Sequence, residues 1–220
     1  MRKIILASFI SLDGIIQAPG GPDEDRSGGF NKGGWLVHNS DPIINDNLAA
    51  IMQEPFDLLL GRRTYEIFAS HWPYMPDDDP IAQKFNRITK YVAATQPLQP
   101  YWDNTVHLKG DIVEELKNIR GEEGPNLLIH GSSGLVQTLL ANDLIDVLHL
   151  MTFPVMLGMG KRLFHDGINA KKWRMVNSKI GANGVIVHSY EPAGEIITGS
   201  FAIPNPSAAE LERRKRFENE

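Results

Sequence analysis

Apolar segments typical of strands alternate with amphipathic segments typical of helices through most of this chain. The apolar segments end in glycine, serine or aspartate, and several are followed at once by a helix start. Alternation of this kind predicts an α/β fold with a largely parallel central sheet flanked by helices. We expect strands at 3–10, 56–60, 90–94, near 106, 126–130 and 145–153, and helices at 41–53, 64–70, 79–88, 111–119 and 132–141.

The C-terminal part of the chain has a different pattern. Two strand-like segments, 173–180 and 185–190, flank Gly181-Ala182-Asn183-Gly184, which predicts an antiparallel hairpin at the edge of the sheet. We place one domain over residues 1–192 and a C-terminal extension over 193–220. The extension is expected to contain a short strand at 195–203 and a helix that begins at the capping box Ser207-Ala208-Ala209-Glu210.

Composition excludes several functions. A net charge of −5 without a long basic stripe argues against broad nucleic-acid binding. No apolar stretch approaches the ~20 residues of a membrane span. The absence of cysteine rules out disulfides, thiolate metal sites and a cysteine nucleophile, and the seven histidines show no metal-ligand spacing. We therefore expect a cytoplasmic protein with no bound metal, no nucleic-acid partner and no membrane partner.

The turn Gly61-Arg62-Arg63-Thr64 follows an apolar strand and opens an amphipathic helix. Such a turn presents unpaired backbone N–H groups and the positive end of a helix dipole, and both suit a phosphate. The arginines add planar guanidinium groups that bind phosphate oxygens in pairs. The turn indicates a phosphorylated cofactor, NADP(H) in preference to NAD(H), although two solvated arginines on a surface turn explain the same residues.

A second turn of this kind lies at Gly131-Ser132-Ser133-Gly134-Leu135, after the strand at 126–130. Gly131 lets the backbone approach a ligand closely, and the serines can cap the helix or donate hydroxyls to a pyrophosphate. Helix capping alone would also explain them, and the G-x-G-x-x-G fingerprint of a Rossmann domain is absent. Both turns should lie beyond the carboxyl ends of the strands, where open α/β sheets bind ligands.

Two further motifs accompany these turns in the sequence. They are Ser11-Leu12-Asp13-Gly14 and Pro154-Val155-Met156-Leu157-Gly158-Met159-Gly160-Lys161-Arg162-Leu163-Phe164. Together, and in this order, the motifs resemble the dihydrofolate reductase-like family. The closer resemblance is to the reductase domain of the riboflavin-biosynthesis deaminase–reductase and its stand-alone relatives, and it covers about residues 2–192. The resemblance implies the dihydrofolate reductase-like fold and an NADPH-dependent oxidoreductase.

The resemblance also implies which residues hold NADPH. Gly61 to Thr64 would hold the 2′-phosphate and part of the pyrophosphate, and Gly131 to Leu135 would hold the pyrophosphate from the other helix. Thr95 would border the adenosine, and the backbone near Ile16 would lie beside the nicotinamide. Dihydrofolate reductase usually has a Gly-Gly pair, often joined by a cis peptide, where this chain has Gly131-Ser132.

The substrate residues implied by the resemblance are Asp13 and Gly14, which would shape the pocket mouth, together with Pro154. Trp35 could form an aromatic wall for a flat heterocycle, and packing of its loop onto the core explains it equally well. Asp46 falls, by count alone, near the acidic residue that helps dihydrofolate reductases to protonate the pterin. An exposed helical aspartate is its ordinary explanation.

The substrate expected from these features is a small planar heterocycle such as a pterin or an aminopyrimidine. One alternative is reduction of 5-amino-6-(5-phosphoribosylamino)uracil in riboflavin biosynthesis. Reductases of that kind typically carry a lysine where this chain has Ala7, and an acidic residue where it has Phe68, so a phosphorylated sugar should bind less well. Another alternative is a non-catalytic NADP(H)-binding or ligand-sensing module. Because relatives usually pair, we expect a homodimer, with contacts from the tail after Glu195.

Overall fold

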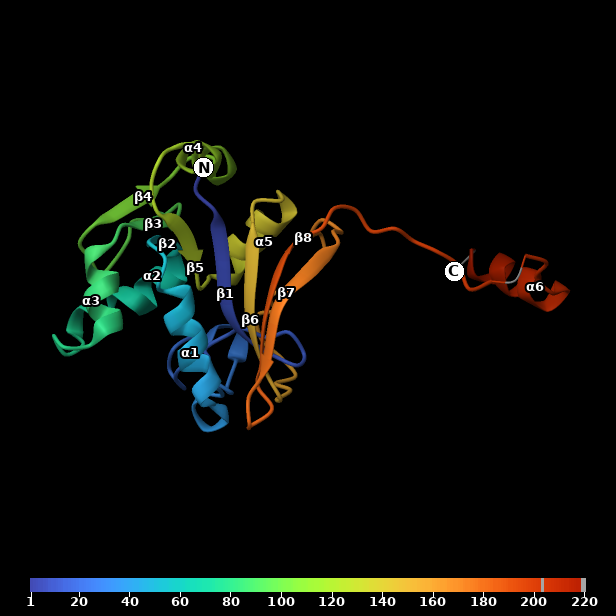
Figure 1. Ribbon diagram of the computed structural model, residues 1–220, viewed down its shortest axis with the longest axis horizontal. Helices are drawn as coiled ribbons and strands as arrows, with labels where there is room; N and C mark the ends of the chain where they lie inside the picture. Colours follow the sequence, from blue (N-terminus) through green and yellow to red (C-terminus); the bar gives the residue numbers. More distant parts are fainter. Residues whose placement is uncertain (203, 219–220) are drawn as a thin grey trace.

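The computed structural model describes residues 1–202 and 204–218, which form an eight-stranded sheet with helices on both faces (Figure 1). The strand order is β4-β3-β2-β5-β1-β6-β8-β7. The first six strands in that order pair in parallel, and β8 pairs antiparallel with both β6 and β7. The strands are β1 (Ile4–Ser11), β2 (Phe56–Gly61), β3 (Lys90–Ala93), β4 (Thr105–Leu108), β5 (Asn126–Ile129), β6 (Val147–Phe153), β7 (Trp173–Ile180) and β8 (Ile186–Pro192).

The predicted helices are also formed, together with short 3-10 helices at 27–29, 37–39 and 72–74. The α-helices are α1 (Pro42–Ile51), α2 (Arg62–Ala69), α3 (Pro80–Arg87), α4 (Ile112–Gly121), α5 (Ser133–Ala141) and α6 (Ala208–Phe217). Helix α2 begins two residues earlier than predicted because Gly61 takes the N-cap position. Within the described part of the chain, no helix is long and apolar enough to cross a membrane.

Strand β1 shows how the sheet is buried on both faces. Its side chains alternate, so that Ile4 and Leu6 pack into one apolar cluster while Ala7 packs into another. Helices α4 and α5 cover the first cluster, and α2 and α3 cover the second. A third cluster joins α1 to β6 and β8. A strand covered on both faces reads as a continuous apolar run, which explains the sequence pattern.

The C-terminal extension differs from its prediction. The structure assigns no strand to residues 195–202, and Ile203 lies outside the described residues. The reason is that the chain leaves the sheet after Gly194, where the last backbone hydrogen bonds join 193 and 194 to Lys172. A segment without a neighbouring strand has no partner for its backbone groups. Helix α6 is formed as expected, with Ser207 as its cap, and stands apart from the sheet (Figure 1).

Candidate functional site

A groove of about 640 Å³ follows the carboxyl ends of β2, β3, β4 and β5. Parallel strands bring these ends to one edge of the sheet, where the turns after β2 and β5 meet. The backbone N–H of Gly61 donates to the carbonyl of Gly131 over 3.2 Å, which fixes one turn against the other. The groove is lined by eight of the predicted cofactor residues: Gly61, Arg62, Arg63, Thr95, Ser132, Ser133, Gly134 and Leu135.

Two α-helices begin at this groove, and among the described residues they are the two without a side-chain cap. Gly61 has no side chain to cap α2, and the hydroxyl of Ser132 makes no capping hydrogen bond to α5. The peptide bond before Ser132 is cis, in line with the family resemblance. The first turns of α2 and α5 therefore keep N–H donors without a side-chain acceptor. The other α-helices begin at side chains that accept from their first turn: Asp41, Asp79, Asp111 and Ser207.

The arginines of the first turn are paired with carboxylates. Arg62 Nη1 lies 2.6 Å from Glu66 Oε1 on the next turn of α2, and Arg63 Nη1 lies 2.6 Å from Asp25 Oδ1. Asp25 comes from the long loop before α1, and its other oxygen lies 2.5 Å from Lys161 Nζ. Each of the three cations stays partly exposed. The turn therefore presents positive charge to the groove, with one loop carboxylate between two of the cations.

Asp25 stays ionised in this setting. Burial alone would raise the pKa of its carboxyl group, but hydrogen bonds from Lys161, Ser27 and Arg63 outweigh burial and hold the pKa well below its ordinary value. The carboxylate thus neutralises part of the charge that Arg63 and Lys161 bring to the site. An anion bound by these two side chains would compete with Asp25 for them.

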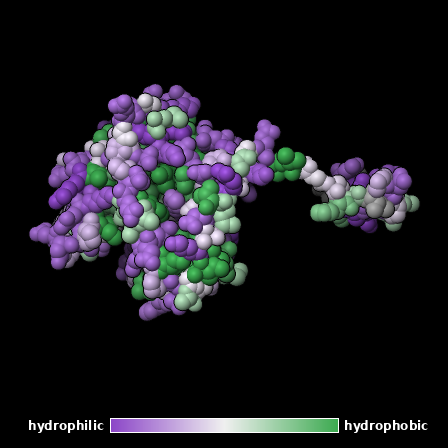
Figure 2. All heavy atoms as spheres, in the orientation of Figure 1, coloured by the Kyte–Doolittle hydropathy of each residue, from purple (hydrophilic) through white to green (hydrophobic). Residues whose placement is uncertain are grey.

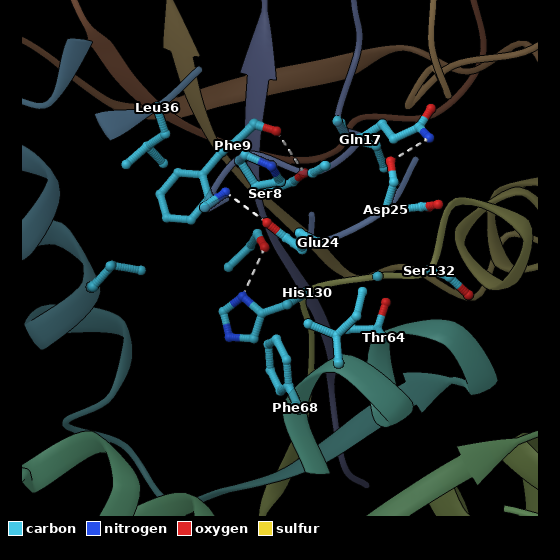
Figure 3. Close-up of a pocket in the computed structure, with 18 of the residues that line it drawn as sticks. Ser8, Phe9, Gln17, Glu24, Asp25, Leu36, Thr64, Phe68, His130 and Ser132 are labelled. Atoms are coloured by element: carbon cyan, nitrogen blue, oxygen red, sulfur yellow. Dashed lines mark hydrogen bonds between the residues drawn. The ribbon is translucent and has the colours of Figure 1, made fainter. Parts of the chain in front are cut away.

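A cavity of about 400 Å³ adjoins the groove and shares Arg63, Ser132, Ser133 and Lys161 with it. The remaining predicted cofactor residues, Ile16, Thr64 and Gly131, line this cavity. Its other walls come from β1, the loop at 16–25, α1, α2 and α3, and they are mostly apolar: Ala7, Phe9, Leu36, Ile44, Leu48, Met52, Ile67, Phe68, Trp72, Ile81 and Phe85. Figure 3 shows Phe9, Phe68 and His130 around this space.

Glu24 is the second loop carboxylate in the cavity wall. Its Oε2 accepts from the backbone N–H of Gly20 over 2.7 Å and of Gly21 over 3.2 Å (Figure 3). Burial raises the pKa of Glu24, and these two donors only partly oppose the shift. In contrast to Asp25, whose pKa is lowered, Glu24 has no ion pair with a cation among the described residues, so its carboxyl group is the more easily protonated of the two.

The structure places the predicted substrate residues Asp13, Gly14 and Pro154 outside the cavity wall. Asp13 accepts from Ser11 Oγ over 2.6 Å and from the backbone N–H of Leu157 and Gly158 over 3.1 and 2.7 Å. It therefore ties the turn after β1 to the segment after β6. Gly14 adopts a φ of 83° in the same turn, and Pro154 is exposed beside the hairpin turn at 181–184. These residues support the pocket from outside.

Trp35 and Asp46 also lie away from the cavity. Trp35 is buried, donates its indole N–H to the Gln17 carbonyl over 2.8 Å and packs edge-on against Phe153, so the packing explanation holds. Asp46 is exposed on α1. Because successive helical residues are about 100° apart, a helix that turns Ile44, Asn45 and Leu48 toward the cavity turns Asp46 away from it.

Three charged residues of the site were not assigned from sequence. Glu24 and Asp25 lie between the first predicted strand and the first predicted helix, where the sequence pattern assigned no element, and Lys161 lies inside the motif at 154–164 but received no role. His130 received no role either; its Nδ1 is 3.1 Å from the Ala7 carbonyl oxygen, but its Nε2 has no partner among the described residues. The acidic run Asp23-Glu24-Asp25 and the arginine turn offered a charge complementarity that could have located the loop.

A mostly parallel sheet that ends in an antiparallel hairpin, with two uncapped helix N-termini at one groove beside an apolar cavity, fits the dihydrofolate reductase-like fold. The family model of the RibD C-terminal domain matches residues 2–187. The chain belongs to this reductase-like family.

Individual relatives agree with the family and the fold. The Bacillus subtilis (strain 168) protein YyaP, itself uncharacterized, is 26% identical over 189 residues, which cover 84% of this chain and 92% of YyaP. A solved structure from Shewanella sp. PV-4, named for riboflavin biosynthesis, superposes with a TM-score of 0.64 at 23% identity and covers 88% of this chain and 99% of that one. Dihydrofolate reductase from Enterococcus faecalis, complexed with NADP(H) and RAB-propyl, superposes with a TM-score of 0.54 at 17% identity. The match covers 86% of this chain and 96% of that one. These two likenesses concern the fold.

Proposed function

We propose that this protein is an NADPH-dependent reductase that transfers hydride to a small planar heterocycle. The observation that carries the proposal is the pair of uncapped helix N-termini, α2 and α5, which meet at one groove with Arg62, Arg63 and Lys161. Backbone N–H donors and guanidinium groups at one place suit an anion with several phosphate oxygens. The solved neighbour from E. faecalis was complexed with NADP(H), which supports the same cofactor class.

The residues of the site would divide the cofactor between the two spaces. Arg62 and Arg63 would hold the 2′-phosphate, Ser132 and Ser133 the pyrophosphate, and Thr95 the adenosine side, with Ile16 in the adjoining cavity. The bound nicotinamide supplies the hydride. The chain itself orients both reactants and lines the cavity with apolar side chains, which keep water from the reacting atoms.

The substrate that fits the cavity best is flat and largely uncharged. Ala7 and Phe68, which stand where riboflavin-pathway reductases typically carry a lysine and an acidic residue, both line the cavity. They offer no charge-assisted hydrogen bond to a sugar phosphate, and each such bond contributes about 1.5–3 kcal/mol. A pterin-like or aminopyrimidine-like ring therefore fits better than a phosphoribosyl compound. A non-catalytic module would retain the cofactor site and turn over neither class.

Titration of the full chain with NADPH and NADH tests the proposal. We expect NADPH to bind at least about tenfold more tightly, because the 2′-phosphate adds charge-assisted hydrogen bonds worth 1.4 kcal/mol or more. Nicotinamide fluorescence measures both affinities. Arg63→Ala should remove most of the preference, whereas Asp25→Asn should raise NADPH affinity because it frees Arg63 and Lys161.

Arg26→Ala is the matched control for this titration. It removes the same charge from an exposed arginine that pairs with Asp23 outside the cavity wall. Its NADPH affinity should stay within about twofold of the parent, since an exposed ion pair contributes little. Equal binding of NADPH and NADH would reject the 2′-phosphate site, and no binding of either would reject the reductase.

We also propose that two copies of the chain pair through the edge formed by β7 and β8. Met175, Val176, Ile180 and Ile186 are exposed there, and Figure 2 shows apolar residues on this side of the body. A grouping of this kind on a surface is typical of an interaction site. Light scattering at micromolar concentration should give the mass of a dimer, and Met175→Lys with Ile180→Lys should give a monomer. A monomer for the unchanged chain would end this proposal.

A further inference from the structure

We infer that His130 selects the substrate in the part of the cavity that Phe68, Trp72 and Phe85 line. There its Nε2 accepts a hydrogen bond from a ring N–H of an uncharged heterocycle. The inference rests on the proposed function, since it takes this cavity to be the substrate pocket. It narrows the substrate class to rings that carry a hydrogen-bond donor. Figure 3 shows the His130 ring among the lining residues, next to Phe68.

The hydrogen bond to Ala7 fixes the tautomer of His130. Its Nδ1 lies 3.1 Å from the Ala7 carbonyl oxygen, and a carbonyl can only accept. Nδ1 therefore carries the hydrogen, and Nε2 of the neutral ring carries a lone pair. Burial lowers the pKa of His130 to about 4, against the opposing effect of the Ala7 carbonyl, so the ring is neutral at physiological pH. Nε2 is thus an acceptor.

This acceptor is buried and has no partner among the residues that the structure describes. Buried polar groups are nearly always hydrogen-bonded, because an unpaired acceptor loses its water and gains nothing in return. The ring cannot turn freely toward another partner, since it packs against Phe68 and Phe85 at centroid distances of 6.0 and 6.2 Å. His130 also lines the cavity, so a bound ligand is the natural source of a donor.

A second unpaired group lies in the same ring cluster. The indole N–H of Trp72 is buried and has no acceptor among the described residues. Trp72 packs against Phe85 at 5.1 Å and against Phe68 at 6.0 Å, and it lines the same cavity. An indole nitrogen can only donate. The cavity wall therefore contains one unused acceptor and one unused donor within a single aromatic cluster.

The surroundings define the rest of the ligand. Leu48, Met52, Phe68, Ile81 and Phe85 offer apolar surface and no charge. The cavity cations, Arg63 and Lys161, are bonded to Asp25 at the side shared with the groove. A flat ring with an N–H donor and a carbonyl or ring-nitrogen acceptor offers the kind of partner that each unpaired group lacks, as a cyclic amide within a heterocycle does. A phosphorylated or cationic substituent placed against these five apolar side chains would be desolvated without a partner.

Two small probes test the inference on the full chain. Quinazolin-4(3H)-one is flat, uncharged and carries a ring N–H beside a carbonyl, and 3-methylquinazolin-4(3H)-one lacks that N–H. We expect calorimetry to give about tenfold tighter binding for the first, because the second leaves the buried acceptor unpaired. The nitrogen NMR signal of His130 Nε2 should move when the first probe binds and stay in place with the second.

Variants of His130 distinguish two causes of weaker binding by the methylated probe, which are the loss of the hydrogen bond to Nε2 and the size of the added methyl group. In His130→Leu the two probes should bind within about twofold of each other, since no acceptor remains. His130→Gln keeps a carbonyl acceptor and should restore part of the preference. NADPH affinity and circular dichroism report whether each variant is folded. If His130→Leu does not fold, the nitrogen signal of the unchanged protein decides the question.

The possible results distinguish this inference from the proposed function. Equal affinities for the two probes, no binding of either, or an unmoved Nε2 signal would overturn the inference even where NADPH binds well. A tenfold preference with a moved signal would support it. If that preference came with no NADPH binding, the reductase would be rejected, and the cavity would remain a site for donor-bearing heterocycles.

Discussion

Replacement of Arg2 by methionine is expected to lower the free energy of unfolding by about 3–5 kcal/mol, which is the usual cost of removing one partner of a buried ion pair. Arg2 Nη2 lies 2.5 Å from Asp57 Oδ2, and the two side chains are only 3% and 11% exposed. Arg2 Nη1 also donates to the Tyr91 hydroxyl over 3.2 Å. Methionine retains the apolar stem but leaves the Asp57 carboxylate buried without its cation.

Urea unfolding measures this change, and two variants interpret it. Lys3→Met places the same side chain at an exposed neighbouring position and should alter the free energy of unfolding by less than about 0.5 kcal/mol. Adding Asp57→Asn to Arg2→Met should recover part of the loss, because the buried charge is removed while an oxygen remains for the Thr89 N–H. A loss below 1 kcal/mol in Arg2→Met would contradict the expected burial of the pair.

The location of this ion pair separates stability from ligand binding. Asp57 and Tyr91 lie at the amino ends of β2 and β3, whereas the groove follows the carboxyl ends of these strands. The folded fraction of Arg2→Met should therefore bind NADPH with nearly unchanged affinity. Parallel strands place the two ends of the sheet far apart, so one end can stabilise the fold while the other holds the ligand.

The fold could be predicted because its signals are local. Apolar runs and helix starts repeat along the chain, and strands covered on both faces leave continuous apolar sequence, as in 56–60 and 126–130. The limits of prediction appear where local pattern fails. Arg62 belongs to the helix, since the cap is Gly61, and residues 195–202 leave the sheet because no strand lies beside them.

The groove was predictable for the same reason, since each of the two turns that form it is a continuous segment. The adjoining cavity was not, because its residues meet only in the folded chain. Asp25 is 38 residues from Arg63 and 136 from Lys161 in sequence, and its loop carries no periodic pattern. Asp46 was chosen by count, and the phase of α1 turns it away from the cavity. The unpaired Nε2 of His130 depends on three-dimensional packing that strand periodicity does not report.

Replacement of Gly61 by alanine should damage both the fold and the proposed cofactor site, because Gly61 is where the two helix-opening turns touch. A Cβ at this position would lie 2.0 Å from Ser132 Oγ and 3.1 Å from the Ser132 nitrogen. The φ of Gly61 is −78°, so alanine meets no backbone penalty and the whole effect comes from this contact. Forcing extra volume into a packed site costs about 1–3 kcal/mol.

The same change should weaken NADPH binding at least about tenfold, since a 1 Å displacement of binding groups is enough for a large loss. The added methyl group pushes α2 and α5 apart and strains the 3.2 Å hydrogen bond from Gly61 to Gly131, so their N–H groups no longer converge on one anion. Gly121→Ala is the matched control, since a Cβ there meets nothing within 4 Å. Adding Ser132→Gly to Gly61→Ala removes the 2.0 Å contact and should recover much of the stability, with less recovery of binding because the Ser132 hydroxyl is lost too. Thermal unfolding, measured beside the titration, separates a loss of stability from a loss of NADPH affinity. If Gly61→Ala bound NADPH as tightly as its parent, the two turns could not act as one phosphate site.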